Sequence, residues 1–337
     1  MPENNLVNQL SAQALSTAGF TQAEAETLLN QVSLPDIMAA ANLVTRRHFG
    51  NKVTMCAIYA AKVGRCANDC AFCAQSAHHQ GPLAPVKVSD LNETQIIANA
   101  QELARLKVSR YSFVTSGESL TGPEFERILY LFRTLKAETN IGLCASLGSL
   151  TKERALALKQ AGVSRYHHNL ETSRSFFPRI CSTHSYDDKL TTIAIARDAG
   201  FEICCGGILG LGESPQDRLE LAFALKELQV DCVPLNILNP IPGTKLAHQP
   251  RLSVAEILRA IALFRLILPQ TVLKFAGGRE NALGTAEPQG YTAGINSLLA
   301  GNYLTTTGKT FEAELRTLAA AGVTLVGEKL FPPTGTS

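Results

Sequence analysis

Residues 110–147, RYSFVTSGESLTGPEFERILYLFRTLKAETNIGLCASL, contain the pattern that decides the fold. The stretch opens with a β-branched and aromatic run at 110–115 and closes with a second apolar run at 141–147. Between them, residues 123–139 repeat apolar side chains at helical spacing, and Gly122 serves as a cap that would put Pro123 in the first helical position. A strand, a helix and a strand in this order predict a parallel βαβ unit.

The same alternation extends in both directions from this unit. Strands are predicted at residues 53–59, 110–115, 141–147, 164–170, 202–209, 232–238, 272–276 and 297–304. Helices are predicted between them at residues 90–106, 123–139, 152–160, 186–199, 215–228, 254–268 and 289–296. About eight strands over about 250 residues match a closed (β/α)8 TIM-type barrel of the α/β class, and a doubly wound open sheet is the alternative. A barrel would place its functional residues at the carboxyl ends of the strands and in the loops that follow them.

The ends of the chain flank this alternation. Residues 1–50 form an N-terminal helical extension in this interpretation, with Leu6, Leu10 and Phe20 at roughly helical spacing and a further helix at 36–49. We therefore divide the chain into an extension (1–50), a barrel (51–310) and a C-terminal helix and tail (311–337). No low-complexity tract, long charge run or linker separates two domains within the barrel region.

Composition excludes several classes of protein. Hydrophobic residues make up 45% of the 337 residues and charged residues 18%, so the chain can bury a sizeable core and is not disordered. The net charge of +2 builds no strong field for nucleic acid or anionic lipid. No apolar run reaches the roughly 18 residues of a membrane helix, and the first 20 residues are too polar for a signal peptide, so a cytoplasmic location is expected. Nine cysteines are too few for a disulfide scaffold at this length, which leaves metal ligands or buried side chains.

Three of the cysteines form the most specific motif in the chain. Cys66, Cys70 and Cys73 have the spacing Cys-x3-Cys-x2-Cys in the loop after the first predicted strand. A [4Fe–4S] cluster held by three thiolates leaves one iron open for another molecule. A structural zinc site would need a fourth ligand, for which His78 or His79 is available, and three buried thiols are the remaining alternative.

The motif is the signature of the radical S-adenosylmethionine (SAM) superfamily, and its continuation resembles the biotin synthase family. The resemblance covers about residues 45–310. It rests on blocks that are similar to those of the family: Cys66 to Ser76 with Gln75-Ser76, His168-Asn169-Leu170-Glu171-Thr172, Gly206-Gly207-Ile208-Leu209-Gly210-Leu211-Gly212-Glu213, Val233-Pro234-Leu235-Asn236, Pro242-Gly243-Thr244 and Ala276-Gly277-Gly278-Arg279-Glu280.

This resemblance implies a reaction. Biotin synthases convert dethiobiotin into biotin, using two adenosyl radicals to abstract hydrogens and inserting sulfur from an auxiliary iron–sulfur cluster that is consumed. The radical is carried by SAM, so no side chain is expected to be the catalyst. SAM is chelated by the open iron of the [4Fe–4S] cluster on Cys66, Cys70 and Cys73.

The resemblance also implies contacts for the two small molecules. For SAM these are Phe72 near the adenine, Asn169, Glu171 and the closely approaching backbone of Gly206 and Gly207; for the substrate they are Asn236 and the pair Thr305 and Thr306. Each contact except Phe72 has a structural alternative. Asn169 and Glu171 would be a polar strand end, and Gly206 and Gly207 a strand bulge. Asn236 would be a satisfied core amide, and the threonine pair a loop cap. Arg279 and Glu280 form either a structural pair or a substrate contact.

The chain departs from the family at the auxiliary cluster. The usual [2Fe–2S] cluster is held by three cysteines and an arginine, of which Cys144 and Cys204 match, while Ser112 and Lys274 stand at the other two positions. We expect Cys181, in the loop after the fourth strand, to complete a different set with Cys144 and Cys204. Three thiolates suit a four-iron cluster, one iron of which could carry an extra sulfide.

The other cysteines and the adjacent histidines are interpreted from strand geometry. Because side chains alternate along a strand, Cys205 points away from the barrel interior if Cys204 points into it. Cys205, Cys56 and Cys232 are expected to be core residues. For the same reason only one of His167 and His168 can line the barrel.

Two alternative functions remain at this point. One is another radical SAM enzyme, a maturase or mutase, which would not need an auxiliary sulfur donor. The other is a non-catalytic iron–sulfur electron carrier or sensor. The resemblance further implies reduced flavodoxin or ferredoxin as electron donor and a homodimer, with neither nucleic acid nor membrane as a partner.

Overall fold

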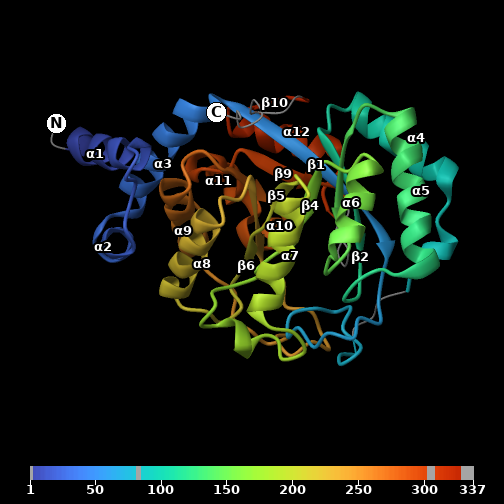
Figure 1. The fold of residues 1–337 in the computed structure, drawn as a ribbon. Coiled ribbons are helices and arrows are strands. Elements are labelled where there is room, and N and C mark those ends of the chain that lie inside the picture. The colour runs from blue at the N-terminus through green and yellow to red at the C-terminus, as the bar shows by residue number, and fades with distance from the viewer. Residues whose placement is uncertain (1–2, 81–84, 302–307, 328–337) are drawn as a thin grey trace.

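The computed structural model describes residues 3–80, 85–301 and 308–327. The chain begins with the helices α1 (Glu3–Leu15), α2 (Gln22–Gln31) and α3 (Leu34–Phe49), which lie together at one side of the molecule (Figure 1). Thr21 and Glu24 form a capping box at the start of α2, and Ser33 caps α3 with Pro35 in its first turn. These caps fix where the second and third helices of the predicted extension begin.

The strands form a closed parallel barrel. They are β1 (Lys52–Lys62), β2 (Arg110–Thr115), β3 (Gly142–Ser146), β4 (Arg165–His167), β5 (Glu202–Cys204), β6 (Gly207–Leu209), β7 (Cys232–Ile237), β8 (Val272–Phe275), β9 (Ser297–Ala300) and β10 (Thr324–Leu325). The ladder runs β1-β2-β3-β4-β5-β7-β8-β9, and β9 pairs with β1 to close it. β5 and β6 occupy one strand position, since both pair with β7. The predicted (β/α)8 TIM-type barrel is therefore confirmed, and β10 adds to the start of β1 outside the ring.

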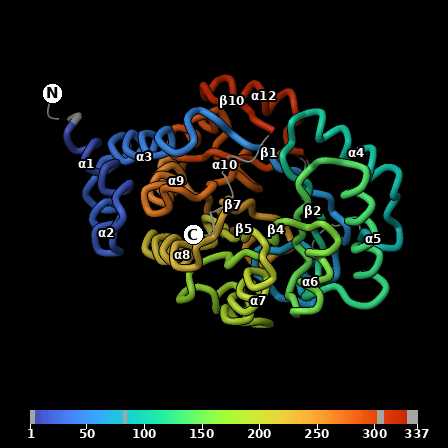
Figure 2. The backbone as a smooth tube through the Cα atoms, turned by 45° about the horizontal axis from the view of Figure 1, so that its top comes forward, coloured from blue at the N-terminus to red at the C-terminus, as the bar shows by residue number. Residues whose placement is uncertain are grey.

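Helices cover the outside of this barrel, as Figures 1 and 2 show. They are α4 (Glu93–Arg105), α5 (Gly122–Glu138), α6 (Lys152–Gln160), α7 (Tyr186–Asp198), α8 (Pro215–Glu227), α9 (Val254–Ile267), α10 (Arg279–Leu283), α11 (Glu287–Ala293) and α12 (Phe311–Ala320), with short 3-10 turns at Val88–Asp90, Phe177–Arg179 and Gly284–Ala286. The N-terminal helices pack on one side of this layer, α3 against α9 and α11 and α2 against α8. The extension thereby closes over barrel helices rather than over the carboxyl ends of the strands.

Several boundaries differ from those predicted. The expected strand at 202–209 is interrupted at Cys205 and Gly206, where a Cβ on Gly206 would lie 2.1 Å from the carbonyl oxygen of Pro234. Helix α5 begins one residue earlier than predicted, with Thr121 as its cap and Gly122 at φ +53°. The expected helix at 289–296 begins at Glu287 and is preceded by α10. Backbone contacts between neighbouring strands, which periodicity does not reveal, cause the first of these differences.

A buried charge network ties the C-terminal helix to the barrel. Arg279 is fully buried and donates hydrogen bonds to Glu287 and Glu314 and to the carbonyl oxygen of Leu299. Glu314 lies on α12 and Leu299 on β9, so this guanidinium joins two elements at the closure of the barrel. Arg279 thus has a structural role at the closure of the barrel.

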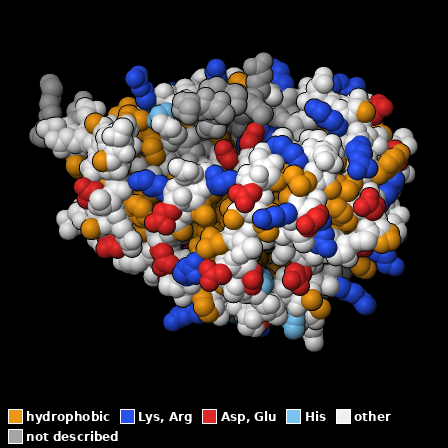
Figure 3. Space-filling view, viewed as in Figure 1, with side chains coloured by type: hydrophobic (Ala, Val, Ile, Leu, Met, Phe, Trp, Pro, Cys, Tyr) orange, Lys and Arg blue, Asp and Glu red, His pale blue; other side chains and the backbone are white. Residues whose placement is uncertain are grey.

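The described surface carries mixed charge. On the face seen in Figure 3, Lys and Arg side chains are interspersed with Asp and Glu. Among the described residues, no helix is both long and apolar enough to span a bilayer. The mixed surface charge agrees with the near-neutral net charge of the chain.

Candidate active site

A cavity of about 410 Å³ occupies the interior of the barrel. Its wall is built from alternate residues of the strands, which point inward, and from the loop that follows β1. Phe72 and Cys73 of this loop line the cavity, as do polar groups at the ends of β4 and β7. The cavity therefore connects the carboxyl ends of the strands, where barrel enzymes hold their substrates, with the interior below.

The loop after β1 is braced by its own backbone. The N–H of Cys66 donates to the carbonyl of Gln75 (2.9 Å), and the N–H of Ala77 donates back to the carbonyl of Cys66 (2.8 Å). Ser76 Oγ donates to the carbonyl of Asn68 (2.6 Å). These bonds gather the three cysteines of the motif within one compact turn, where each is half-buried. Burial raises the pKa of Cys73 to about 11 when no metal is bound.

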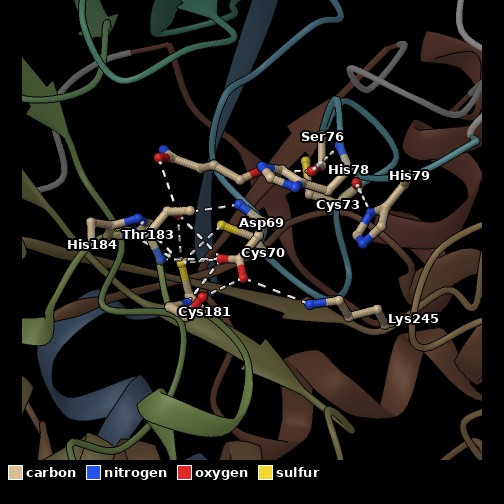
Figure 4. A network of polar contacts seen from close by, with 12 residues as sticks. Asp69, Cys70, Cys73, Ser76, His78, His79, Cys181, Thr183, His184 and Lys245 are labelled. Atoms are coloured by element: carbon tan, nitrogen blue, oxygen red, sulfur yellow. Dashed lines mark hydrogen bonds and ion pairs between the residues drawn. The ribbon is translucent and has the colours of Figure 1, made fainter.

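A second loop, residues 180–184, holds this turn from the other side (Figure 4). Asp69 accepts hydrogen bonds from the N–H and hydroxyl of Ser182 (2.9 and 2.6 Å) and from the N–H and hydroxyl of Thr183 (3.3 and 3.2 Å). The bonds from Ser182 hold the pKa of this carboxyl well below its usual range. The N–H of Ala71 also donates to the carbonyl of Ile180 (2.8 Å). The loop after β4 thus fixes the position of the cysteine motif.

Cys181 belongs to this brace. Its Sγ lies 3.8 Å from that of Cys70, 3.3 Å from a carboxylate oxygen of Asp69 and 3.2 Å from Nδ1 of His184 (Figure 4). Cys70, Cys181 and His184 are close enough together to hold a metal ion. Cys181 does not line the cavity, whereas Cys144 and Cys204 do. The structure therefore splits the predicted trio and places Cys181 beside the cysteine motif.

The residues predicted to contact SAM divide into two groups. Asn169 and Glu171 line the cavity, and Asn169 Nδ2 donates to Glu171 (3.2 Å). Glu171 has φ +73°, a strained conformation for a residue other than glycine. Gly206 and Gly207 do not line the cavity; a Cβ on Gly207 would lie 2.4 Å from the carbonyl oxygen of Glu171. These two glycines allow neighbouring strands to approach closely, which is the strand-packing alternative.

The substrate residues have mixed outcomes. Asn236 lines the cavity, where its Nδ2 donates to the carbonyl of Gly207 (3.3 Å) and its Oδ1 accepts from the N–H of Gly277 (3.0 Å). These bonds fix the amide and leave its second N–H and second lone pair for a ligand. Thr305 and Thr306 lie outside the described residues.

Cysteines and cations share the floor of the cavity. Cys144, Cys204, Lys274 and Arg165 all line it, together with Ser112. Lys274 Nζ lies 3.8 Å from Cys204 Sγ. A hydrogen bond with Cys232 and the charge of Lys274 outweigh burial and lower the pKa of Cys204 to about 7. Burial alone would lower the pKa of Lys274, but the negative charge of the adjacent Cys204 thiolate raises it, so Lys274 stays protonated.

Among the cysteines and arginines of the lining, three were not assigned to the site by the sequence analysis. Cys56 was expected in the core, yet it lines the cavity, as do Arg110 and Arg165. The two arginines share Glu202 as an ion-pair partner, at 2.6 and 2.7 Å. Every second side chain on β1, β2 and β4 faces the interior, and this alternation would have identified the three residues if it had been known which set of side chains faces inward on each strand.

The expected orientations of adjacent side chains at the ends of β4 and β5 agree with the structure. His167 lines the cavity with Nδ1 3.4 Å from Cys204 Sγ, while His168 does not. Burial lowers the pKa of His167 to about 4, so this imidazole is neutral. Cys205 and Cys232 are fully buried and are absent from the lining.

The donor groups fit iron–sulfur clusters and SAM. Three thiols share one turn, and one of them, Cys73, lines the cavity at its mouth, while further thiols beside cations line its floor. Thr115 Oγ1, also in the lining, is buried without a hydrogen-bond partner in the described structure. An unsatisfied polar group in a cavity is the feature expected where a polar ligand binds.

Comparison with known proteins gives the same result. A family model described as "Radical SAM superfamily" matches residues 62–225, and one described as "Biotin and Thiamin Synthesis associated domain" matches residues 234–324. The biotin synthase of Pelotomaculum thermopropionicum is 45% identical over 318 residues, covering 93% of this chain and 98% of that protein. The biotin synthase of Nitratidesulfovibrio vulgaris (strain DSM 19637) is 49% identical over 297 residues, covering 86% and 81%.

Solved structures share the fold. Methylornithine synthase has a TM-score of 0.80 at 18% identity, covering 94% of this chain and 97% of its own. The [FeFe]-hydrogenase maturase HydG has a TM-score of 0.79 at 19% identity, covering 95% and 76%. Cysteine motif, cavity and relatives agree: the chain is a radical SAM enzyme and belongs to the biotin synthase family.

Proposed function

We propose that this enzyme inserts sulfur into dethiobiotin to form biotin, with the sulfur supplied by an auxiliary iron–sulfur cluster. One observation carries the proposal: the same cavity is lined by Cys73 of the cysteine motif at its mouth and by a second set of thiols at its floor. A substrate held between the two would face the source of the radical on one side and the source of sulfur on the other. Such seclusion suits radical chemistry, because it excludes water and competing hydrogen donors.

Cys66, Cys70 and Cys73 would hold a [4Fe–4S] cluster with one open iron for SAM. When bound and reduced there, SAM supplies the radical that removes hydrogen from unactivated C–H positions. Phe72, in the lining next to Cys73, offers an apolar face for the adenine. Glu171 is aimed into the cavity from a strained backbone and is held by Asn169 Nδ2, so its carboxylate can accept hydrogen bonds from ribose hydroxyls.

Cys144 and Cys204 would hold the auxiliary cluster at the floor. Ser112 and Lys274, which stand where the family has a cysteine and an arginine, both line the same part of the cavity. A protonated Lys274 has no lone pair for iron, so its role is that of a counter-charge to thiolates and sulfide. Because only two of the four usual donors are present, we propose a four-iron cluster in place of the usual [2Fe–2S] cluster, and this cluster would supply the sulfide for insertion.

Asn236 would recognise the ureido group of dethiobiotin. Its amide offers one donor and one acceptor beyond the two hydrogen bonds that orient it, and a ureido group presents both an N–H and a carbonyl. The pair Thr305 and Thr306 remains proposed for the substrate carboxylate on the strength of the family resemblance.

An acidic electron donor such as flavodoxin or ferredoxin would dock at the cysteine motif. The exposed side chains of Arg65, Arg179 and Lys245 lie around the cysteine motif. Arg65 precedes Cys66. Arg179 and Lys245 are next in sequence to Ile180 and Leu246, whose backbones are hydrogen-bonded to that of Ala71 in the motif. Positive charge on this rim would steer a negatively charged partner to the cluster. A cytoplasmic location and a homodimer complete the proposal and follow from the family resemblance.

An anaerobic assay tests the function. The purified, reconstituted enzyme is mixed with SAM, dethiobiotin and a low-potential reductant, and biotin, 5′-deoxyadenosine, iron and acid-labile sulfide are measured before and after. We expect biotin to form with about two 5′-deoxyadenosines each, at the expense of sulfide from the protein. 5′-Deoxyadenosine without biotin would contradict this and favour another radical SAM activity. No 5′-deoxyadenosine at all would favour an electron carrier.

A further inference from the structure

The register of the barrel determines which side chains share a height inside it. In a closed eight-stranded barrel, a layer contains four side chains contributed by alternate strands, and strand tilt shifts the layer by about one residue per strand crossed. Cys56 pairs with Arg110, and Arg110 pairs with Gly142. Advancing two residues from Gly142, one for each strand crossed, leads to Cys144. Cys56 and Cys144 therefore belong to one layer.

The same step repeated around the barrel completes this layer. From Cys144 the ladder leads through Arg165 to Glu202, and two residues farther along the strand is Cys204. From Cys204 it leads through Cys232 to Val272, two residues before Lys274. From Lys274 it leads through Ser297 to Thr54, two residues before Cys56. Four steps of two residues each return to Cys56, which is the stagger of about eight residues that closes a barrel of this type. Cys56, Cys144, Cys204 and Lys274 form what we call the thiol layer, and all four line the cavity.

The register also separates the thiol layer from its neighbours. Ser112 pairs directly with Cys144, so on the adjacent strand it lies about one residue farther toward the mouth. Cys232 pairs directly with Cys204 but lies one strand farther round, which puts it in the layer below. Cys232 is fully buried and does not line the cavity, whereas Cys56 does.

We propose that Cys56 is the third thiolate of the auxiliary cluster, with Cys144 and Cys204. This inference rests on the proposed function, since it assumes that the cluster at the cavity floor is the auxiliary one. Cys56 replaces the ligand lost at Ser112, one layer closer to the floor. Three thiols and one cation then surround the barrel axis at one height, and the fourth corner, Lys274, faces the part of the cluster that no thiolate holds.

The charges around the thiol layer suit this assignment. Lys274 interacts electrostatically with Cys56 as well as with Cys204. Arg110 pairs with Cys56 in the ladder, and the charges of Arg110 and Arg165 act on Cys144. Three cations thus lie around three thiols, and one carboxylate, Glu202, pairs with both arginines. The net positive charge that remains compensates part of the negative charge that iron-bound thiolates and sulfides would bring into a buried site.

The other two candidate thiols have different partners. Cys232 pairs with Cys204 in the ladder between β5 and β7 and does not line the cavity. Cys181 contacts Cys70 of the cysteine motif and does not line the cavity. A third ligand from either residue would require the cluster to leave the centre of the thiol layer.

The test counts iron in the full-length protein without using activity. In a background with Cys66, Cys70 and Cys73 all changed to alanine, the remaining iron and sulfide after anaerobic reconstitution belong to the auxiliary site, and Mössbauer spectra report its type. We expect Cys56→Ala to lose this iron as fully as Cys144→Ala does. Cys232→Ala, Cys181→Ala and the outward-facing Cys205→Ala should keep the iron of the background protein.

Full auxiliary iron in Cys56→Ala would overturn the assignment. Loss of that iron in Cys232→Ala or Cys181→Ala, with retention in Cys56→Ala, would in addition identify the true third ligand. Thermal melts of the metal-free proteins, including Cys56→Ser, control for folding, and we expect Cys56→Ser to melt close to the background protein but to reconstitute a depleted or altered cluster. Absence of auxiliary iron from the background protein itself would refute both the assignment and the proposed sulfur source. Failure of Cys56 alone would leave the proposed function standing.

Discussion

The cysteine motif at 66–73 and the thiol layer contain the same chemical groups but are built in opposite ways. The three thiols of the motif lie within eight residues of one loop and are held by short-range backbone bonds and by Asp69. The three thiols of the layer come from β1, β3 and β5, and 148 residues separate Cys56 from Cys204 in the chain. The motif is half-buried at the mouth of the cavity, whereas the layer lies at its floor among Arg110, Arg165 and Lys274.

The difference shows how each site tolerates change. A local motif keeps its geometry only if its own residues persist, so every cysteine in it is indispensable. A barrel layer can exchange one corner for another, because several inward positions lie at similar distances from the axis. The loss of a thiol at Ser112 and its supply at Cys56 would be such an exchange.

The largest effect that we expect is from Cys70→Ala. It removes one of three ligands of the motif, so SAM cleavage should fall by a factor of about a thousand or more. Auxiliary iron should remain, because the thiol layer is built independently. Rates of 5′-deoxyadenosine formation and iron content together test this. Loss of both kinds of iron would show that the two sites depend on each other.

Lys274→Met tests the counter-charge of the thiol layer. Removing a buried partner of charged groups costs about 3–5 kcal/mol, which predicts a loss in auxiliary-cluster affinity of roughly a hundredfold to a few thousandfold. Biotin formed per 5′-deoxyadenosine should fall accordingly, while Lys274→Arg, which keeps the charge, should retain most of it. Equal losses in both variants would argue that shape, and not charge, is what this corner requires.

Glu171→Gln is expected to weaken SAM binding moderately. One charge-assisted hydrogen bond to a ribose hydroxyl contributes about 1.5 kcal/mol, so the KM for SAM should rise roughly tenfold. kcat at saturating SAM and auxiliary iron should change little. Glu153→Gln, on the outer helix α6, is the matched control. A change in kcat with an unaltered KM would contradict the assigned contact.

Glu314→Gln gives the smallest effect and tests a buried charge that holds no metal. Burial raises the pKa of Glu314 from its ordinary 4.5 to about 7, and Arg279 offsets only part of this rise. The folded state therefore binds the proton more tightly, so stability is greatest at low pH and falls as the pH rises toward and through 7. Between pH 6 and 8 we expect a loss of about 1 kcal/mol in the free energy of unfolding, or about one to two degrees of Tm, that shrinks in Glu314→Gln. An equal loss in the variant would exclude Glu314 as its source.

Local signals were sufficient for much of this molecule. The alternation of apolar runs predicted the barrel, and seven of the eight predicted strands each correspond to a single observed strand, because period-2 and period-3.6 patterns are properties of consecutive residues. The strand at 202–209 was the exception, since its break at Gly206 depends on the carbonyl oxygen of Pro234 on a neighbouring strand. The sequence analysis grouped Cys181 with Cys144 and Cys204, whereas the structure places its thiol beside Cys70, because no spacing in the chain shows that residues 180–184 fold onto Asp69.

The sequence by itself determined the class of fold and the cysteine motif, because both reside in short stretches whose physics is local. It also showed that the usual auxiliary ligands are absent, since Ser112 and Lys274 can be read directly. Only the tertiary structure decided which thiols meet. Cys56, Cys144 and Cys204 share a height because strand pairing, tilt and closure fix the register of distant segments together, and that register is a property of the closed barrel and not of any one strand.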